Sequence, residues 1–396
     1  MRTVGVTSRG IRLPILKTGD DLASEVVKSL LAASKEQGFA FHDRDVVAIT
    51  ESIVARTQGN YCSIDNIAQD VKNKTGGETV GVIFPILSRN RFAIMLRGIS
   101  LGVKKVVIML SYPRDEVGNA LIDEEEIYRT KINPYTDVLD EKKFRELFGY
   151  PVHEFTGVDY ISYYKQLVQE AGAECEIIFA NQAEAILEYT DVVIAADIHT
   201  RKSTKRKLKE KGARIVLGLD DIMNASVNGS GYNPTYGLLG ANKSTEDKVK
   251  LFPREGQDLV ENVQKMLLKE TGKHIEVMVY GDGAFKDPQG KIWELADPVV
   301  SPFHTVGLKG TPNELKLKYL ADEQYKDLKG ENLKEAITEE IKRKEKDLKG
   351  KMASEGTTPR QLTDLLGSLS DLTSGSGDKG TPVVLIQGYF DNYADN

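Results

Sequence analysis

A single aspartate stands between two glycines directly after a short apolar run, in the segment Gly281-Asp282-Gly283. The preceding run, residues 275–280, has the length and composition of a buried β-strand. A carboxylate just beyond such a strand is held in place by the sheet, and flanking glycines let a ligand approach the backbone closely. Mg²⁺ commonly uses one or two carboxylates together with phosphate oxygens and water. The segment therefore predicts a metal–phosphate site, with an ordinary Gly-Asp-Gly turn as the alternative.

Several glycine-rich or basic segments accompany this aspartate in a defined order along the chain. They are Gly10-Ile11-Arg12-Leu13-Pro14, the strand-and-helix segment 45–59 that carries Arg56, the segment Gly240-Ala241-Asn242-Lys243-Ser244, and the loop Ser374-Gly375-Ser376-Gly377 ahead of an apolar strand at 383–386. Backbone amides of glycine-rich loops can wrap phosphates, and arginine or lysine can pair with phosphate oxygens. For each segment taken alone, a surface cation, a polar turn or a flexible linker is the alternative.

In this order the segments resemble the coenzyme F-420 γ-glutamyl ligase family, which adds glutamate to a deazaflavin cofactor precursor. The resemblance covers residues 1–60 and 225–396. It implies an α+β domain that is built from both ends of the chain and binds a nucleotide and a metal ion. It further implies GTP or ATP as co-substrate, Mg²⁺ or Mn²⁺ as the ion, and a homodimer.

The resemblance also implies roles for individual residues. The ion would be held by Asp282, with Asn242 and Ser376 at the positions of the family's other ligands. Asn242 stands where the family has an aspartate and brings no charge, which weakens its hold on a divalent ion. Asp282 and Arg56 would act in catalysis. The nucleotide would be bound by residues from the head, the middle and the tail of the chain: Gly10, Ile11, Arg12, Leu13, Arg56, Lys243, Ser374, Gly375, Ser376 and Gly377.

Residues 75–222 have the pattern of a separate α/β unit. Strand candidates at 79–87, 105–110, 175–180, 191–196 and 213–217 alternate with helix candidates at 89–101, 158–171, 182–189 and 202–211. Such alternation predicts a parallel sheet with right-handed crossovers. The predicted fold class is therefore α/β. We interpret this unit as a Rossmann-like domain inserted into the ligase-like part, with a charged excursion of helices and loops near residues 113–154.

Two loops of this unit follow strands and carry arginine. One loop holds Ser88, Arg89 and Arg91, and Ser88 is a natural N-cap for the helix that follows. The other loop holds His199 and Arg201. The carboxyl ends of parallel strands lie at one edge of a sheet, where ligands bind, so the two loops predict a site for a carboxylate or phosphate. Capping residues and solvated arginines are the alternative.

The composition excludes some classes of function. A net charge of −6 argues against a general nucleic-acid binder, which would carry a basic excess. The two cysteines, Cys62 and Cys175, lie far apart and form neither a disulfide framework nor a zinc-ligand spacing. No apolar stretch reaches the roughly 18 residues of a membrane span, and the N-terminus shows no signal-peptide pattern. We therefore expect a cytoplasmic protein with neither a nucleic-acid nor a membrane partner.

These observations together predict a nucleotide-dependent amide ligase. It would join an amino acid, with glutamate as the candidate, to a carboxylate-bearing small molecule through an acyl phosphate. Residues 75–222 would recognise that small molecule. Two alternatives stay open. One is a non-catalytic protein that binds a nucleotide or phosphometabolite on the ligase-like scaffold. The other is a transferase whose chemistry resides in the inserted domain, with Asp197 and His199 as the acting residues.

Overall fold

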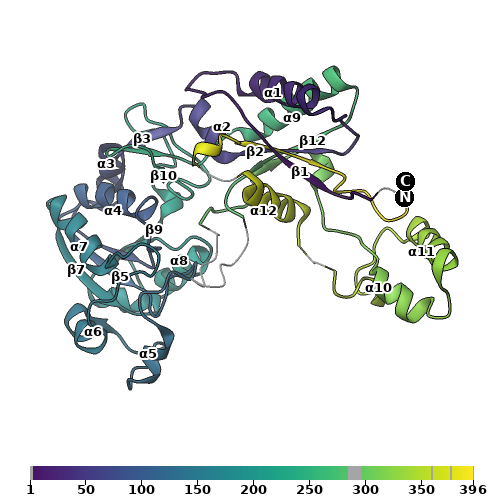
Figure 1. The fold of residues 1–396 in the computed structure, drawn as a ribbon. Helices are drawn as coiled ribbons and strands as arrows, with labels where there is room; N and C mark the ends of the chain where they lie inside the picture. Colours follow the sequence, from purple (N-terminus) through teal and green to yellow (C-terminus); the bar gives the residue numbers. More distant parts are fainter. Residues whose placement is uncertain (1–2, 284–295, 358–359, 375–376, 396) are drawn as a thin grey trace.

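The computed structural model describes residues 3–283, 296–357, 360–374 and 377–395. These residues form three sheets with helices on their faces, which confirms the predicted α/β class. Figure 1 shows two lobes, one around a six-stranded sheet and one around a five-stranded sheet that lies near both chain termini. A smaller helical part extends from the second lobe.

The six-stranded sheet is built entirely from strands between residues 79 and 218. In spatial order its strands are β6 (Leu139–Asp140), β7 (Glu174–Phe179), β5 (Lys105–Leu110), β4 (Thr79–Ile83), β8 (Val192–Ala195) and β9 (Ile215–Gly218). All neighbours are parallel except the short edge strand β6. The strand order changes direction between β4 and β8, and in open parallel sheets the crevice beyond such a switch point is where ligands bind.

The loop after β4 is longer than the sequence pattern predicts. The strand ends at Ile83 instead of Leu87, because Phe84 adopts a φ of 55° and Pro85 follows it. The next helix, α4 (Phe92–Leu101), begins three residues later than predicted, so Ser88 does not cap it. Ser88 instead accepts a hydrogen bond from the backbone N–H of Arg91 within the loop. Residues 84–91 are thereby left as a loop at the carboxyl edge of the sheet.

Helices cover both faces of this sheet. Side chains that alternate along the strands point to opposite sides, so Val82 and Ile108 pack toward one face while Ile83 and Val107 pack toward the other. The first face is covered by α4 and α7 (Tyr160–Glu170), and the second by α8 (Arg201–Glu210) and a 3₁₀ helix (Ala183–Glu188). The predicted excursion contains α5 (Glu124–Tyr128), β6 and α6 (Glu141–Phe148).

The five-stranded sheet joins distant parts of the chain. Its order is β1 (Thr7–Ile11), β14 (Val383–Gln387), β2 (Val46–Thr50), β12 (Glu276–Tyr280) and β13 (Phe303–His304). Strands β2 and β12 are parallel neighbours, with Thr50 directly opposite Tyr280. The residues that follow these two strands therefore emerge at the same edge of the sheet. Glu51 follows one strand, and Gly281 and Asp282 follow the other.

Both faces of the five-stranded sheet are buried. Val47, Val277 and Leu385 pack beneath α1 (Leu22–Gln37) and α9 (Gly256–Thr271), whereas Ala48 and Met278 pack toward α12 (Leu362–Ser374). Figure 1 shows α1 and α9 on one side of the sheet and α12 on the other. Burial on both faces explains why β2, β12 and β14 are apolar without alternation.

A third, small sheet connects the two lobes. It consists of β10 (Asn242–Lys243), β11 (Lys248–Lys250) and β3 (Tyr61–Ser63), and α3 (Ile64–Thr75) follows β3. Cys62, Ile67 and Leu251 pack into the same apolar core as the six-stranded sheet. That core thus extends beyond residues 75–222 into the segments that flank them.

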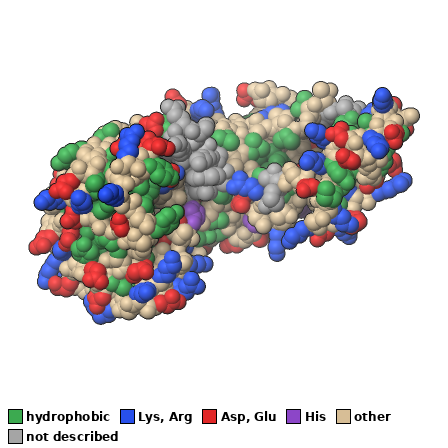
Figure 2. All heavy atoms as spheres, turned by 90° about the horizontal axis from the view of Figure 1, so that it is seen from below, with side chains coloured by type: hydrophobic (Ala, Val, Ile, Leu, Met, Phe, Trp, Pro, Cys, Tyr) green, Lys and Arg blue, Asp and Glu red, His purple; other side chains and the backbone are tan. Residues whose placement is uncertain are grey.

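Residues 312–351 form a mostly charged helical extension. It contains α10 (Leu317–Tyr319), a π-helical turn (Leu320–Gln324) and α11 (Gly330–Arg343) around a small core of Leu320, Ile337 and Ile341. Figure 2 shows acidic and basic side chains interspersed over one face of the molecule, including this extension. None of the helices in the described parts of the chain combines the length and apolar character needed to cross a membrane.

Candidate functional site

Two large cavities lie where the lobes meet, and we name them by the strands that feed them. The β4 cavity, of about 900 Å³, is lined by the loop after β4 and by neighbouring residues. The β2–β12 cavity, of about 710 Å³, lies beyond the carboxyl ends of β2 and β12. Arg91 and Asp282 line both cavities. The two cavities therefore share one wall.

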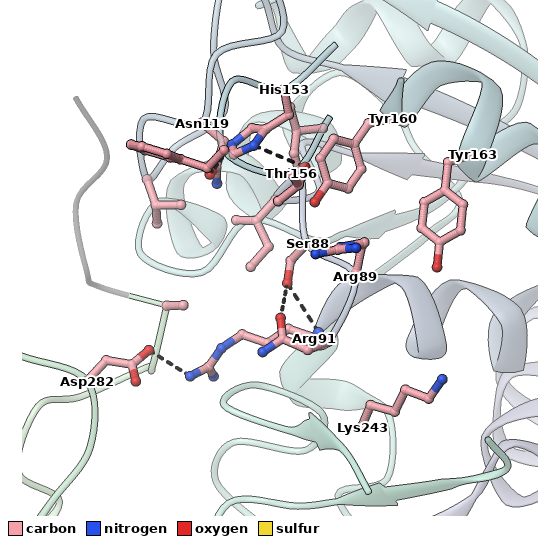
Figure 3. A pocket seen from close by; sticks show the side chains of 16 residues that line it. Ser88, Arg89, Arg91, Asn119, His153, Thr156, Tyr160, Tyr163, Lys243 and Asp282 are labelled. Carbon is pink, nitrogen blue, oxygen red and sulfur yellow. Dashed lines mark hydrogen bonds and ion pairs between the residues drawn. The ribbon is translucent and has the colours of Figure 1, made fainter. Parts of the chain in front are cut away.

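The β4 cavity combines cations with aromatic rings. Its polar and aromatic lining consists of Ser88, Arg89, Asn90, Arg91, Asn119, His153, Phe155, Thr156, Tyr160, Tyr163, Lys243 and Asp282. Figure 3 shows Arg89 close to Tyr160, with Lys243 across the cavity from these rings. The ring of His153 hydrogen-bonds Asn119 and Thr156, each at 3.2 Å, and burial lowers the pKa of this histidine. Such a lining suits an anion that carries an apolar or planar part.

Two buried side chains hold the loop after β4 in place. Asp115 accepts the N–H of Leu87 at 2.8 Å, and burial raises the pKa of Asp115 to about 6. The hydroxyl of Tyr164 accepts the N–H of Ser88 at 2.9 Å and donates to the carbonyl of Ile86 at 2.7 Å. The buried side chains of Asp115 and Tyr164 therefore hold the loop that carries the arginines in place.

The β2–β12 cavity is lined by residues from the head, middle and tail of the chain. Its lining includes Leu13, Pro14, Leu16, Thr50, Glu51, Arg56, Arg91, Asn242, Tyr280, Asp282, Asp371, Ser374, Gly377 and Gly380. Arg56 comes from the short helix α2 (Glu51–Thr57), and its Nε donates to the carbonyl of Leu16 at 2.6 Å. This bond ties the head loop to the cavity rim.

Arg91 bridges two aspartates of the five-stranded lobe. One guanidinium nitrogen, Nη2, lies 2.7 Å from Oδ2 of Asp282, and the other, Nη1, lies 2.7 Å from Oδ1 of Asp297. The backbone N–H of Asp282 donates to Oδ2 of Asp297 at 2.8 Å. Figure 3 shows Arg91 reaching from the loop after β4 to Asp282 on the facing segment. An arginine fork on two carboxylates is a strong, directional contact, and here it links the lobes.

A second ion pair lies in the wall of the β2–β12 cavity. Lys250 Nζ lies 2.9 Å from Oε1 of Glu51, and both side chains are buried. Oε2 of Glu51 is buried and has no hydrogen-bond partner within the described residues. Burial raises the pKa of Glu51, and burial also raises that of Tyr280 to about 12. Buried polar atoms normally find a partner, so this oxygen of Glu51 is a candidate contact for a ligand in this cavity.

The residues facing this cavity suit a divalent ion held together with phosphate. Asp282, Asp371 and Glu51 offer carboxylate oxygens, and Asn242 offers a carbonyl. Burial raises the pKa of Asp371, whose carboxylate accepts the N–H of Gly283 at 3.1 Å. In the ranges that the structure describes, no three His, Cys, Asp or Glu side chains form a ready-made metal cage.

The sequence-predicted residues fall into three groups in space. Asp282, Arg56, Leu13, Asn242, Ser374 and Gly377 line the β2–β12 cavity. Ser88, Arg89, Arg91 and Lys243 line the β4 cavity, so Lys243 lies with the inserted loop and not beside Arg56. Gly10 and Ile11 lie within β1 and Arg12 is exposed, and these three residues line neither cavity. Gly375 and Ser376 lie outside the described residues.

The loop after β8 takes no part in lining either cavity. The carboxylate of Glu116 accepts the backbone N–H groups of Ile198, His199 and Thr200. Arg201 forms an ion pair with Asp220 at 3.0 Å, and Asp197 accepts hydroxyl hydrogen bonds from its own loop and helix. The carboxylate of Glu116 therefore accepts the backbone N–H groups just ahead of α8, and His199 and Arg201 line neither the β4 cavity nor the β2–β12 cavity.

Sequence reasoning missed several residues of these cavities. One of them, Glu51, had a signal, because a carboxylate directly after an apolar strand is the same pattern that identified Asp282. Asp371 lies one helical turn before the glycine-rich tail loop. Asp297 and Lys250 had no local signal, since each is recruited by a partner far away in sequence.

The sequence matches a known protein family over nearly its whole length. Among curated proteins, no relative matched the sequence. The family described as F420-0:Gamma-glutamyl ligase matches residues 10–388, a span that also takes in residues 75–222. The family name denotes a ligase that forms a glutamyl amide, so the match points to an amide-ligase enzyme. The chain belongs to the F420-0:gamma-glutamyl ligase family.

Proposed function

We propose that this protein is a nucleotide-dependent amide ligase that joins an amino acid to a carboxylate-bearing small molecule. One observation carries the proposal: two cavities of suitable size share the wall formed by Arg91 and Asp282. A ligase of this kind must hold a triphosphate and an acid with their reacting ends together. The β2–β12 cavity would take the nucleotide, and the β4 cavity would take the acid, which we call the acceptor.

The proposed reaction has two balanced steps. An oxygen of the acceptor carboxylate attacks the γ-phosphorus, and the bond to the nucleoside diphosphate breaks. The amine of the amino acid then attacks the carbonyl carbon of the acyl phosphate, inorganic phosphate leaves, and the nitrogen loses a proton. The transferring phosphoryl group needs positive charge around it. Arg56 at the cavity rim would supply one such charge.

The chain offers groups for the remaining tasks. Asp282 would hold Mg²⁺ or Mn²⁺ with Asn242 as a neutral neighbour, and the ion would neutralise phosphate charge. Glu51 faces the same cavity with a buried oxygen that lacks a protein partner, and this oxygen would accept the proton of the amine. Arg89 and Lys243 would bind anionic groups of the acceptor in the β4 cavity.

We infer the wider organisation from the same features. Residues 1–60 and 225–396 would form the nucleotide- and metal-binding unit, with 75–222 as the inserted unit that selects the acceptor. We further propose a cytoplasmic homodimer that uses GTP or ATP, with glutamate as the first amino acid to test.

The proposal is tested on the full chain with ATP or GTP, Mg²⁺ or Mn²⁺, an amino-acid mixture and pools of carboxylic acids. We expect release of nucleoside diphosphate that depends on an acid pool, together with an amide product in mass spectra. Asp282→Asn should abolish both. Asp191→Asn, a change in a half-exposed acid that pairs with Arg214 on the surface, should leave both intact. Nucleotide binding without turnover in any pool would instead support the non-catalytic binding protein, which the neutral Asn242 favours.

A further inference from the structure

The side chain of Arg91 occupies an unusual position, because it faces two cavities and satisfies two acids at once. Only 13% of the side chain is exposed, against 20% for Asp282 and 2% for Asp297. Both acids belong to the lobe of the five-stranded sheet, and the arginine belongs to the loop after β4. The contact therefore depends on how two distant parts of the chain meet.

We propose that Arg91 exchanges partners, so that ligands in the two cavities promote each other's binding; this inference rests on the proposed function. In the structure the guanidinium pairs with Asp282 and Asp297. With ligands bound, Arg91 turns to an anionic group of the acceptor in the β4 cavity, and the two acids face the cation that accompanies the nucleotide. The fork of arginine suits both states, since it matches a carboxylate or phosphate as well as it matches the aspartates.

The electrostatics of the wall favour such an exchange. The N–H of Asp282 holds Asp297 at 2.8 Å, so the two acids form one unit. When Arg91 leaves, two adjacent like charges remain, and such a pair attracts a cation strongly. While Arg91 stays, its charge competes with an incoming cation for the same carboxylate. Each ligand thus removes an obstacle to the other, and by linkage the coupling must be reciprocal.

The lining of the β4 cavity also suits the anionic ligand with which the displaced arginine would pair. Arg89 offers positive charge to an anion in the cavity, and Phe155, Tyr160 and Tyr163 offer rings to an apolar part of the ligand. Lys243 lies in the same lining, where it pairs with Glu246 at 2.6 Å. An aromatic carboxylate is therefore a fitting probe. Arg91 already lines this cavity, so the proposed exchange calls for a movement of its side chain.

The sharpest test measures Mn²⁺ binding, by the electron paramagnetic resonance signal of the free ion, in the presence of a non-hydrolysable ATP or GTP analogue. Arg91→Gln removes the competing charge, so we expect Mn²⁺ to bind about tenfold more tightly than to the unchanged chain. Arg91→Lys, which keeps a charge but loses the fork, should lie between the two and covers the case in which the glutamine variant does not fold. Arg145→Gln is the matched control, because Arg145 is similarly buried in an ion pair with Asp159 at 2.9 Å and lines neither cavity.

The second arm adds benzoate at millimolar concentration. Benzoate should tighten Mn²⁺ binding to the unchanged chain about fivefold and should have no effect on Arg91→Gln. Unchanged or weaker Mn²⁺ binding in Arg91→Gln would overturn the exchange while leaving the proposed ligase intact. Absence of Mn²⁺ binding in the unchanged chain and in every Arg91 variant, with either nucleotide analogue, would overturn the metal site of the proposed function and the exchange with it.

Discussion

Nζ of Lys250 lies 2.9 Å from Oε1 of Glu51 in the wall of the β2–β12 cavity, and the two side chains are 10% and 6% exposed. The residues are 199 positions apart in the sequence. The pair joins the small sheet that connects the lobes to the edge of the five-stranded sheet. It places a buried carboxylate in the lining of the cavity that Asp282 also lines, and one oxygen of this carboxylate has no hydrogen-bond partner within the described residues.

Lys250→Met should cost about 3 kcal/mol of unfolding free energy, because it leaves a buried carboxylate without its cation. Glu51→Leu combined with Lys250→Met should recover most of that loss, since a buried ion pair can often be replaced by apolar groups of similar size. Urea unfolding of the single and double variants measures both changes. Lys28→Met, which removes an exposed cation paired with Glu25, is the control and should leave stability nearly unchanged. Equal losses in the single and double variants would contradict this prediction.

Tyr164→Phe should loosen the loop after β4 without removing a residue from either cavity. The hydroxyl is the partner of both the N–H of Ser88 and the carbonyl of Ile86, and its loss leaves these groups unsatisfied at a cost of about 1–3 kcal/mol. Hydrogen exchange of residues 86–91 should become faster. Tyr163→Phe, one position earlier, leaves both bonds in place and serves as the comparison. Equal exchange rates in the two variants would show that Tyr164 does not hold the loop.

The ionisation of Asp115 should make stability depend on pH. Its pKa is raised from 3.8 to about 6 by burial, so the folded chain binds this proton more tightly than the unfolded chain does. Stability therefore falls as the pH rises from about 4 to about 6, by about 3 kcal/mol at 1.36 kcal/mol for each unit of pKa. The measurement is the stability of the chain minus that of Asp115→Asn at a series of pH values. A difference that stays flat, or rises, over this range would refute the prediction.

Gly281→Ala should disturb the acid pair that Arg91 bridges. A Cβ atom at this position would lie 2.1 Å from Oδ2 of Asp297, and that oxygen already accepts the N–H of Asp282. We expect a loss of about 1–3 kcal/mol in unfolding free energy from this overpacking. Gly5→Ala is the matched control, because a Cβ atom there meets nothing within 4 Å. The side chain of Asp297 could avoid the new Cβ atom only by breaking its hydrogen bond with the N–H of Asp282. A fully stable Gly281→Ala variant would therefore mean that this hydrogen bond contributes little to stability.

Local pattern was enough to predict most elements of the fold. Residues 105–110 form a strand with the predicted bounds, and residues 275–280 form β12 to within one residue, because continuous apolar runs are buried on both faces. Alternating strands and helices also predicted the parallel sheet. The predicted ends were wrong where the backbone departs from regular geometry, as at Phe84, whose positive φ ends β4 early. The spacing of hydrophobic residues along the sequence does not reveal such a bend in the backbone.

The sequence by itself determined that a carboxylate follows β12 at Asp282 and that arginines follow β4, since both facts depend only on residues close together in the chain. The tertiary structure alone decided that Arg91 reaches Asp282 across 191 positions of sequence. It likewise decided that Lys243 lies with the β4 loop, whereas Arg201 pairs with Asp220 away from the cavities. Local propensity depends on neighbours along the chain, whereas the pairing of charges depends on how packed lobes meet. The burial of apolar side chains determines how the lobes pack, and it does not depend on which charged residues are brought into contact as a result.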